Sequence, residues 1–311
     1  MNILLSTDNK YLMPTGVLMH SIGVNNGSDV HYHILTDPEF SESSVSSLRR
    51  IAERYNNTIA FYTITSEMTK NLPFGREDQP KGVTIATYYR LFISKVLPES
   101  VHKIIYLDGD MIVRKSLDDL WNTDMTGYAL GAVHDMHEAY HCTSRRLPYQ
   151  MEEKGYLNAG MLLINLDYWR EHECLSKFMK CVDENFEKLI MHDQDVLNVV
   201  LHNEVKWLPV TYNFQSCFLE KANKPGRFWH VEKEIELYKR DPAIVHFTAE
   251  DKPWKIEVFH TYTKDWRKFF FRSEWKHDKL QGEKSTNLKQ KLRNFLVRHC
   301  LYTPPTIYEM F

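Results

Sequence analysis

The feature that most constrains this chain is a short apolar run that ends in two carboxylates. Ile104 to Leu107 are aliphatic or aromatic and partly β-branched, which predicts a buried strand. Asp108, Gly109 and Asp110 follow directly. In an open α/β sheet, ligands bind beyond the carboxyl ends of the strands. We therefore expect this strand to present both carboxylates to a ligand.

Two carboxylates held this close repel each other unless a divalent cation lies between them. Oxygen ligands suit Mg²⁺ and Mn²⁺, and both ions commonly bridge to substrate phosphates. Gly109 lets the backbone turn tightly and leaves room for a ligand. The alternative is a surface turn with two solvated aspartates, because Asp-Gly is also a common turn sequence.

Alternating strands and helices precede this run. Strands are expected at Asn2–Thr7, Val30–Thr36 and Thr58–Ile64. Two helices separate them, one with Pro14 in its first turn and one capped by Ser41. Since parallel β-α-β units are right-handed by default, the pattern predicts an α/β fold with a Rossmann-like, mostly parallel sheet flanked by helices.

The later elements are spaced less regularly. Further strands are expected at Tyr128–Val133, Leu157–Asn165 and Ala243–Phe247. Further helices are expected over Thr84–Val96, with Arg90 near the middle, over about Leu166–Leu189, and from His192 onward. Residues 72–82 contain two prolines and two glycines and predict a loop, and residues 136–155 predict a second loop over the site.

Polar residues follow several of these strands, so one site along one edge of one sheet is expected. They are Asp8, the Asp108/Asp110 pair, Asp135 and His246. Opposite the aspartate pair, His246 is a candidate third metal ligand through a neutral imidazole nitrogen. Lys252 could place a positive charge against a diphosphate. The alternatives are an ordinary histidine of a core or loop and an ordinary surface lysine.

Composition narrows the class of protein. The 311 residues are 43% hydrophobic and 26% charged, a globular composition in a chain long enough for one large domain or for one domain with an appendage. Five scattered cysteines without a Cys-x-x-Cys pair disfavour a disulfide framework or a zinc site. The chain shows no signal peptide, no apolar segment of the roughly 20 residues that cross a bilayer, and no sign of a nucleic-acid partner. We expect a cytoplasmic protein.

The C-terminal segment differs from the rest of the chain. Residues 264–311 hold 11 Lys and Arg against five Asp and Glu, a net charge of +6 in a chain of net charge −2. We expect two parts, a catalytic domain over 1–263 and a basic, aromatic tail with a short helix over 264–311. The tail either packs back onto the body or docks on an anionic membrane surface, which would make the protein peripheral on the inner face of a membrane.

Several stretches, in order, resemble glycosyltransferase family 8, which includes bacterial lipopolysaccharide α-galactosyl- and α-glucosyltransferases and glycogenin. They are the first strand with Asp8 and Tyr11, Thr87–Leu91, Tyr106–Asp110, Asn158–Leu166, His192–Asn198, and His246–Phe247 with Lys252–Trp254. The resemblance implies a GT-A fold, a UDP-hexose donor, Mn²⁺ or Mg²⁺, a glycan or glycolipid acceptor, and transfer of glucose or galactose with retention at the anomeric carbon.

The resemblance also implies roles for individual residues. The metal ligands would be Asp108, Asp110 and His246. The donor nucleotide would contact Asp8, Lys10, Tyr11, Asp108, Gly109, Ala249 and Lys252. The catalytic residues around the donor sugar would be Arg90, Asn158, Asp193 and Gln194, with Asp135 on the acceptor side. Two positions depart from the family pattern: Ala249 replaces a usual glycine, and Lys10 stands where amides are common.

The residues leave the route of retention open, since it requires either a carboxylate nucleophile, for which Asp193 is available, or attack from the face that the diphosphate leaves, with Gln194 against the anomeric carbon. Other classes fit the residues less well. An aspartate-nucleophile phosphatase would have Thr or Val where this chain has Ile112, and a nucleotidyltransferase would have a glycine-rich loop after the first strand. A non-catalytic relative that binds a UDP-sugar or a glycan is the remaining alternative.

Overall fold

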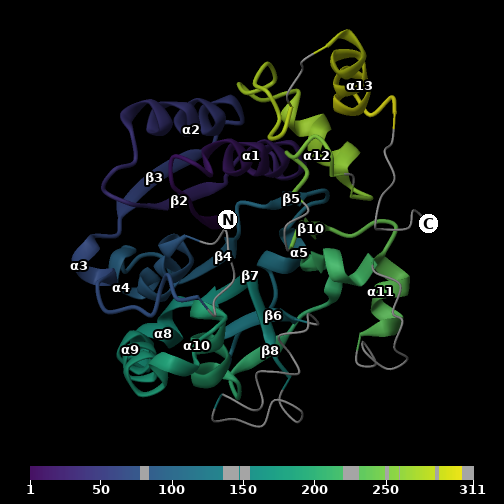
Figure 1. Cartoon of the computed structure of the whole chain (residues 1–311). Coiled ribbons are helices and arrows are strands. Elements are labelled where there is room, and N and C mark those ends of the chain that lie inside the picture. Colours follow the sequence, from purple (N-terminus) through teal and green to yellow (C-terminus); the bar gives the residue numbers. More distant parts are fainter. Residues whose placement is uncertain are drawn as a thin grey trace.

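A seven-stranded sheet forms the centre of the protein in the computed structural model, with helices on both sides (Figure 1). The structure describes residues 1–77, 84–135, 147, 155–219, 231–248, 252–258, 260–283 and 287–302. The strand order is β3-β2-β1-β4-β7-β6-β8. These strands are β1 (Asn2–Ser6), β2 (His31–Thr36), β3 (Thr58–Thr63), β4 (Lys103–Leu107), β6 (Leu130–His134), β7 (Leu157–Asn165) and β8 (Val205–Trp207).

The sheet is mostly parallel, as the sequence predicts. The β1–β2, β1–β4, β2–β3 and β6–β8 pairs are parallel. Strand β7 is the exception, because it runs antiparallel to both β4 and β6. The beginning of β7 therefore lies at the same edge of the sheet as the end of β4, which brings Asn158 toward Asp108.

Both faces of the sheet are buried, which explains the continuous apolar runs in its strands. Ile3 and Leu5 of β1 belong to one core cluster and Leu4 to the other. The first cluster packs beneath α1 (Leu12–Asn26) and α2 (Glu42–Arg54), and the second packs beneath α8 (Leu166–Glu171), α9 (Cys174–Asn185) and α10 (His192–Leu201). Figure 1 shows these two groups of helices on opposite sides of the sheet.

A second, three-stranded sheet has the order β5-β10-β9. Its strands are β5 (Met111–Val113), β9 (Phe214–Gln215) and β10 (Ile244–His246). Strand β5 follows the aspartate pair directly and is antiparallel to β10, with Met111 opposite His246. His246 therefore approaches the aspartates from this second sheet, whereas the sequence predicted one edge of one sheet.

The remaining elements are short. The α-helices are α3 (Ser66–Thr69), α4 (Ile93–Val96), α5 (Asp118–Trp121) and α11 (Glu232–Tyr238). The 3₁₀ helices are η1 (Ile85–Phe92), η2 (Phe186–Lys188), η3 (Val210–Tyr212) and η4 (Ser216–Leu219).

Two expected helices take a different form. The segment expected as one helix over Thr84–Val96 is mostly the 3₁₀ helix η1. Side chains three residues apart eclipse each other in a 3₁₀ helix, which puts Thr87 and Arg90 on one side. The helical segment expected over about Leu166–Leu189 is helical but divided at Glu173, whose positive φ of 49° does not continue a helix.

A local signal predicted the start of one helix correctly, and another explains where a helix ends. The Ser41 side chain accepts a hydrogen bond from the Ser44 N–H and caps α2. Helix α1 ends at Asn26 before Gly27, whose φ is +65°. The first expected loop is described up to residue 77, and of the second only residues 147 and 155 are described, so residues 78–82 of the first and most of the second lie outside the described residues.

The C-terminal segment contains two helices, α12 (Thr263–Phe270) and α13 (Leu288–Arg298). Trp266, Phe269 and Phe270 of α12 are buried in the same core cluster as α1. Helix α13 instead leaves Leu288 and Leu292 exposed, while its Val297 is buried. None of the described helices is both long and apolar enough to cross a bilayer. The division of the chain at residue 263 stays a prediction.

Candidate active site

A bulge in β7 lies at the centre of the candidate site. Along the β6–β7 pair, Ala132 is opposite Leu162 and the next residue, Val133, is opposite Asn158. Ala159, Gly160 and Met161 therefore form a bulge away from β6. A bulge releases backbone groups from the ladder, and bulges are common next to active sites. Here three of the four N–H and C=O groups of Ala159 and Gly160 bind side chains.

The N–H and C=O groups of two residues of this bulge, Ala159 and Gly160, bind four candidate residues. The N–H of Ala159 donates to Gln194 Oε1 at 2.9 Å, and the N–H of Gly160 donates to Asn158 Oδ1 at 3.0 Å. The carbonyl of Ala159 accepts from the Arg90 guanidinium. The carbonyl of Gly160 accepts from the backbone N–H of Asp108 at 2.8 Å. The bulge thus sets the positions of these residues relative to one another.

Gly160 is required for steric reasons. A Cβ at this position would lie 2.3 Å from Cε1 of His246 and 2.8 Å from Met111 Cε. Ring and backbone are in direct contact because Gly160 has no side chain. The closeness of β7 to His246 therefore depends on glycine at this position.

Asp108 is held by a buried arginine. Arg90 Nη2 donates to Asp108 Oδ1 at 2.8 Å, and the same oxygen accepts from the Tyr106 hydroxyl at 2.7 Å. The guanidinium carbon of Arg90 lies 4.2 Å from the centroid of the Tyr106 ring. These two hydrogen bonds to Oδ1 fix the orientation of the Asp108 carboxylate. Tyr106 was predicted only as a strand residue and as part of a matching stretch, without a role in the site.

Asp110 lies between two nitrogen groups. Lys252 Nζ donates to Asp110 Oδ2 at 2.5 Å, and His246 Nε2 lies 3.3 Å from Asp110 Oδ1. Burial raises the pKa of Asp110, but Lys252 and His246 outweigh this and hold the pKa well below its usual range. Asp110 is therefore a carboxylate near neutral pH. Lys252 also donates to the carbonyl of Phe247 at 2.6 Å.

Asp193, at the start of α10, pairs with the other side of Arg90. Its Oδ2 lies 2.9 Å from Arg90 Nε, and Oδ1 accepts from the Thr87 hydroxyl at 2.5 Å. Burial raises the pKa of Asp193 to about 6, although Arg90 and Thr87 act in the opposite direction. Arg90 is thus shared between two carboxylates, Asp108 and Asp193. Thr87 was predicted only as part of a matching stretch, without a role.

Asp135, Asn158 and Gln194 form one hydrogen-bonded group. Asp135 Oδ2 accepts from Asn158 Nδ2 at 3.0 Å and from Gln194 Nε2 at 2.9 Å. All three side chains are at most 9% exposed. The expected acceptor-side carboxylate is thus joined directly to two expected donor-sugar residues.

The expected nucleotide residues cluster at the ends of β1 and β4. Asp8 Oδ1 accepts from the backbone N–H groups of Lys10 and Tyr11 at 2.9 and 2.8 Å. A Cβ on Gly109 would lie 3.1 Å from Tyr11 Cδ1, so the aspartate turn packs against the Tyr11 ring. The ring of Trp254 meets Tyr11 edge-on, with centroids 5.6 Å apart. Lys10 is exposed, and Ala249 lies outside the described residues.

The donor set of Asp108, Asp110 and His246 fits a divalent cation. One ligand atom from each residue lies within 4.8 Å of the others. Two carboxylate oxygens and one imidazole nitrogen suit Mn²⁺, and Mg²⁺ would accept the oxygens more readily than the nitrogen. Asp108 and Asp110 supply two negative charges, which the charge of such an ion would balance.

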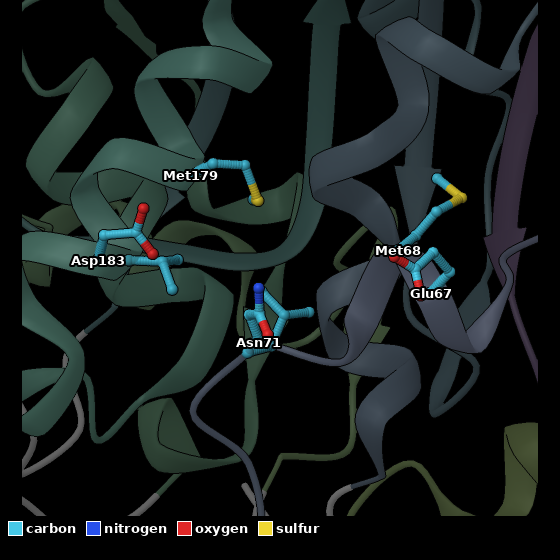
Figure 2. Close-up of a pocket in the computed structure, with 7 residues that line it drawn as sticks. Glu67, Met68, Asn71, Met179 and Asp183 are labelled. Carbon is cyan, nitrogen blue, oxygen red and sulfur yellow. The ribbon is translucent and has the colours of Figure 1, made fainter.

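A separate small cavity lies between α3 and α9. Its volume is about 160 Å³, and Figure 2 shows Met68, Asn71 and Met179 among its lining residues. Its seven lining residues include none of the expected site residues. This cavity and the candidate site are therefore lined by different residues.

Comparisons with known proteins agree on one family. The model of the family described as Glycosyl transferase family 8 matches residues 2–257. Glycosyltransferase GlyF of Streptococcus pneumoniae serotype 4 is 29% identical over 254 residues, which is 81% of this chain and 57% of GlyF. The lipopolysaccharide 1,2-glucosyltransferase of Escherichia coli K12 is 24% identical over 301 residues, 96% of this chain and 86% of that protein.

A solved structure gives the same fold. The crystal structure of the galactosyltransferase LgtC with donor and acceptor sugar analogs superposes with a TM-score of 0.75 at 22% identity, covering 94% of this chain and 100% of LgtC. The fold of this chain is thus the GT-A fold of that enzyme, with its mostly parallel seven-stranded sheet between helices.

The contact between Gly160 and His246 generates a prediction. Replacing Gly160 by Ala should displace the His246 ring and weaken Mn²⁺ binding about tenfold or more, a typical effect of disturbing the support of a ligand. Overpacking should also cost about 1–3 kcal/mol of stability. Mn²⁺ affinity is measured by electron paramagnetic resonance, and stability by urea unfolding.

Gly131→Ala is the matched control. Gly131 lies in β6 of the same sheet as Gly160, and a Cβ there would lie 2.9 Å from Leu208 Cδ1. It should lose comparable stability and keep wild-type Mn²⁺ affinity. Equal Mn²⁺ affinity in the two variants would show that Gly160 does not position His246.

Proposed function

The chain belongs to glycosyltransferase family 8, and we propose that it transfers glucose or galactose from a UDP-hexose to a hydroxyl of a glycan, with retention at the anomeric carbon. The observation that carries the proposal is the convergence of Asp108, Asp110 and His246 beside Lys252. The names of a lipopolysaccharide glucosyltransferase and a galactosyltransferase among the similar proteins support a lipid-linked or cell-surface oligosaccharide as acceptor.

Asp108, Asp110 and His246 would hold Mn²⁺ or Mg²⁺, which when bound supplies a Lewis acid for the leaving diphosphate. The residues themselves add positive charge. Lys252 would bind a diphosphate oxygen, and this fixed charge stabilises the negative charge that develops on the leaving group. Asp8 and Tyr11 would contact the uridine, with Lys10, Gly109 and Ala249 beside the nucleotide.

Arg90, Asn158, Asp193 and Gln194 would surround the donor sugar, and Asp135 would face the acceptor. As the sugar–phosphate bond breaks, positive charge develops on the sugar ring, which a nearby carboxylate stabilises. Asp193 is such a carboxylate, held by Arg90 and Thr87. Gln194 is held at both ends of its amide and would keep a fixed distance to the anomeric carbon. Asp193 would serve the route with a carboxylate nucleophile, and Gln194 would serve attack from the face that the diphosphate leaves.

Helix α13 supports a location at a membrane. Leu288, Leu292 and Phe295 are 82%, 58% and 52% exposed and recur three or four residues apart, with Lys289 and Lys291 exposed beside them. Apolar side chains flanked by lysines complement an anionic lipid surface. We propose that this helix, rather than the buried aromatic residues of α12, holds the enzyme at the inner face of a membrane.

The proposed activity can be measured directly. With a pool of UDP-hexoses, a pool of glycan acceptors and Mn²⁺, the protein should release UDP and form an α-linked product from the α-linked donor. Asp110→Asn should reduce transfer by at least about 100-fold, because an amide supplies no charge to the cation site. Proton NMR of the first product identifies the anomer. A β-linked product, or full activity of Asp110→Asn with Mn²⁺, would contradict the proposal.

The pKa of Asp193 predicts a pH dependence. If ionised Asp193 stabilises positive charge on the sugar, kcat should fall as the pH is lowered through about 6, because protonation removes that charge. The measurement is a pH profile of kcat at saturating Mn²⁺ and donor. Asp193→Asn should have a low kcat without this acid limb. The same limb in Asp193→Asn would assign it to another group.

The membrane proposal is tested with the full chain and vesicles. The wild type should cosediment with anionic vesicles at low salt and not with neutral vesicles. Leu292→Glu combined with Phe295→Glu should abolish this binding, since two carboxylates replace exposed apolar groups. Leu237→Glu is the matched control, because Leu237 on α11 is 70% exposed and lies outside the tail. Equal binding of all three proteins would remove α13 from the interaction.

A further inference from the structure

Asn213, a residue to which no role was assigned, connects a proposed metal ligand with a proposed donor-sugar residue. Asn213 follows η3, precedes β9, and is fully buried. Its Oδ1 lies 2.9 Å from Nδ1 of His246, and its Nδ2 donates to Asn158 Oδ1 at 2.8 Å. One amide therefore joins a proposed metal ligand to a proposed donor-sugar residue.

The N–H of Gly160 determines which atoms donate and which accept in this chain of hydrogen bonds. The N–H of Gly160 can only donate, so the Asn158 atom that it meets is the amide oxygen. The same oxygen then accepts from Asn213, which must present its NH₂ group. The other atom of the Asn213 amide is an oxygen, and it accepts from His246. Nδ1 of His246 therefore carries the hydrogen.

The tautomer of His246 decides whether it can bind a cation. With hydrogen on Nδ1, a neutral imidazole keeps its lone pair on Nε2, the nitrogen that lies 3.3 Å from Asp110 Oδ1. A hydrogen-bond partner on the second ring nitrogen also fixes the orientation of the ring and raises its basicity as a ligand. In the opposite tautomer, Nε2 would present a hydrogen to the cation site.

We infer that Asn213 is a positioning residue, which holds His246 in the tautomer with a free Nε2 lone pair and ties this choice to the orientation of Asn158. The inference rests on the proposed function, since it assumes that Nε2 binds the cation. It assigns two separate tasks to one amide: its oxygen supports the metal ligand, and its NH₂ group supports the donor-sugar residue.

Two variants separate these tasks. Asn213→Leu removes both hydrogen bonds at nearly the same volume, and we expect its Mn²⁺ affinity to fall about 10–100-fold. Asn213→Asp keeps an acceptor for the His246 Nδ1–H but has no hydrogen to give Asn158. We expect Asn213→Asp to bind Mn²⁺ within about threefold of the wild type, while its kcat falls with that of Asn213→Leu.

The tautomer itself is a second readout that needs neither metal nor turnover. Long-range ¹H–¹⁵N NMR of the histidine rings distinguishes the two tautomers, and the signal lost in His246→Gln identifies this ring among the 15 histidines. The wild type and Asn213→Asp should show hydrogen on Nδ1 of His246. Asn213→Leu should show a mixture or hydrogen on Nε2.

Asn57→Leu is the matched control for the loss of a buried asparagine. Asn57 is 7% exposed and accepts from the Val30 N–H at 3.0 Å, just before β2 and β3 at the opposite edge of the sheet from the site. This variant should lose stability and keep Mn²⁺ affinity and the His246 tautomer. The inference is overturned if Asn213→Leu keeps both as well. A wild type that fails to bind Mn²⁺ with or without UDP would contradict the proposed function instead.

Discussion

The arrangement of the site depends on the bulge in β7, where the backbone of Ala159 and Gly160 leaves the β6 ladder. Buried peptide groups must find hydrogen-bond partners. Here they find them in Gln194, Asn158, Arg90 and the backbone of Asp108. Groups from three distant parts of the chain, together with the neighbouring Asn158, are thereby held against two consecutive residues, on a rigid strand rather than on a loop.

Charge balance explains why the residues around the bulge are arranged as they are. Arg90 is buried, and it remains charged because Asp108 and Asp193 pair with it on two sides. Asp110 is balanced by Lys252. Each carboxylate of the site has a cationic or hydrogen-bonding partner, so none is buried alone. A divalent cation would bring positive charge to this site and a diphosphate would bring negative charge. In the proposed arrangement Asp110 therefore binds the cation and Lys252 binds the diphosphate.

The sequence predicted what local patterns encode and missed what long-range pairing decides. The strand before Asp108 and the Ser41 cap were predictable from an apolar run and a short capping signal. The apolar pattern of Leu157–Asn165 predicts a strand, but it carries no information about the antiparallel direction or the bulge. The strand that contains His246 was also predicted, but at an edge of the main sheet, because a short apolar run does not show that it pairs with β5 in a second sheet. Asn213 carries no sequence signal, since its function depends only on the partners that the fold brings to it.

The central claim is that the β7 bulge holds the site ready for its ligands before they bind. The most direct test is a crystal structure of the full chain with Mn²⁺ and a UDP-hexose. We expect the ion on Asp108, Asp110 and Nε2 of His246, with the backbone of Ala159 and Gly160 and its four hydrogen bonds unchanged within about 0.5 Å. An ion bound elsewhere, or a bulge that rearranges when the donor binds, would contradict this account.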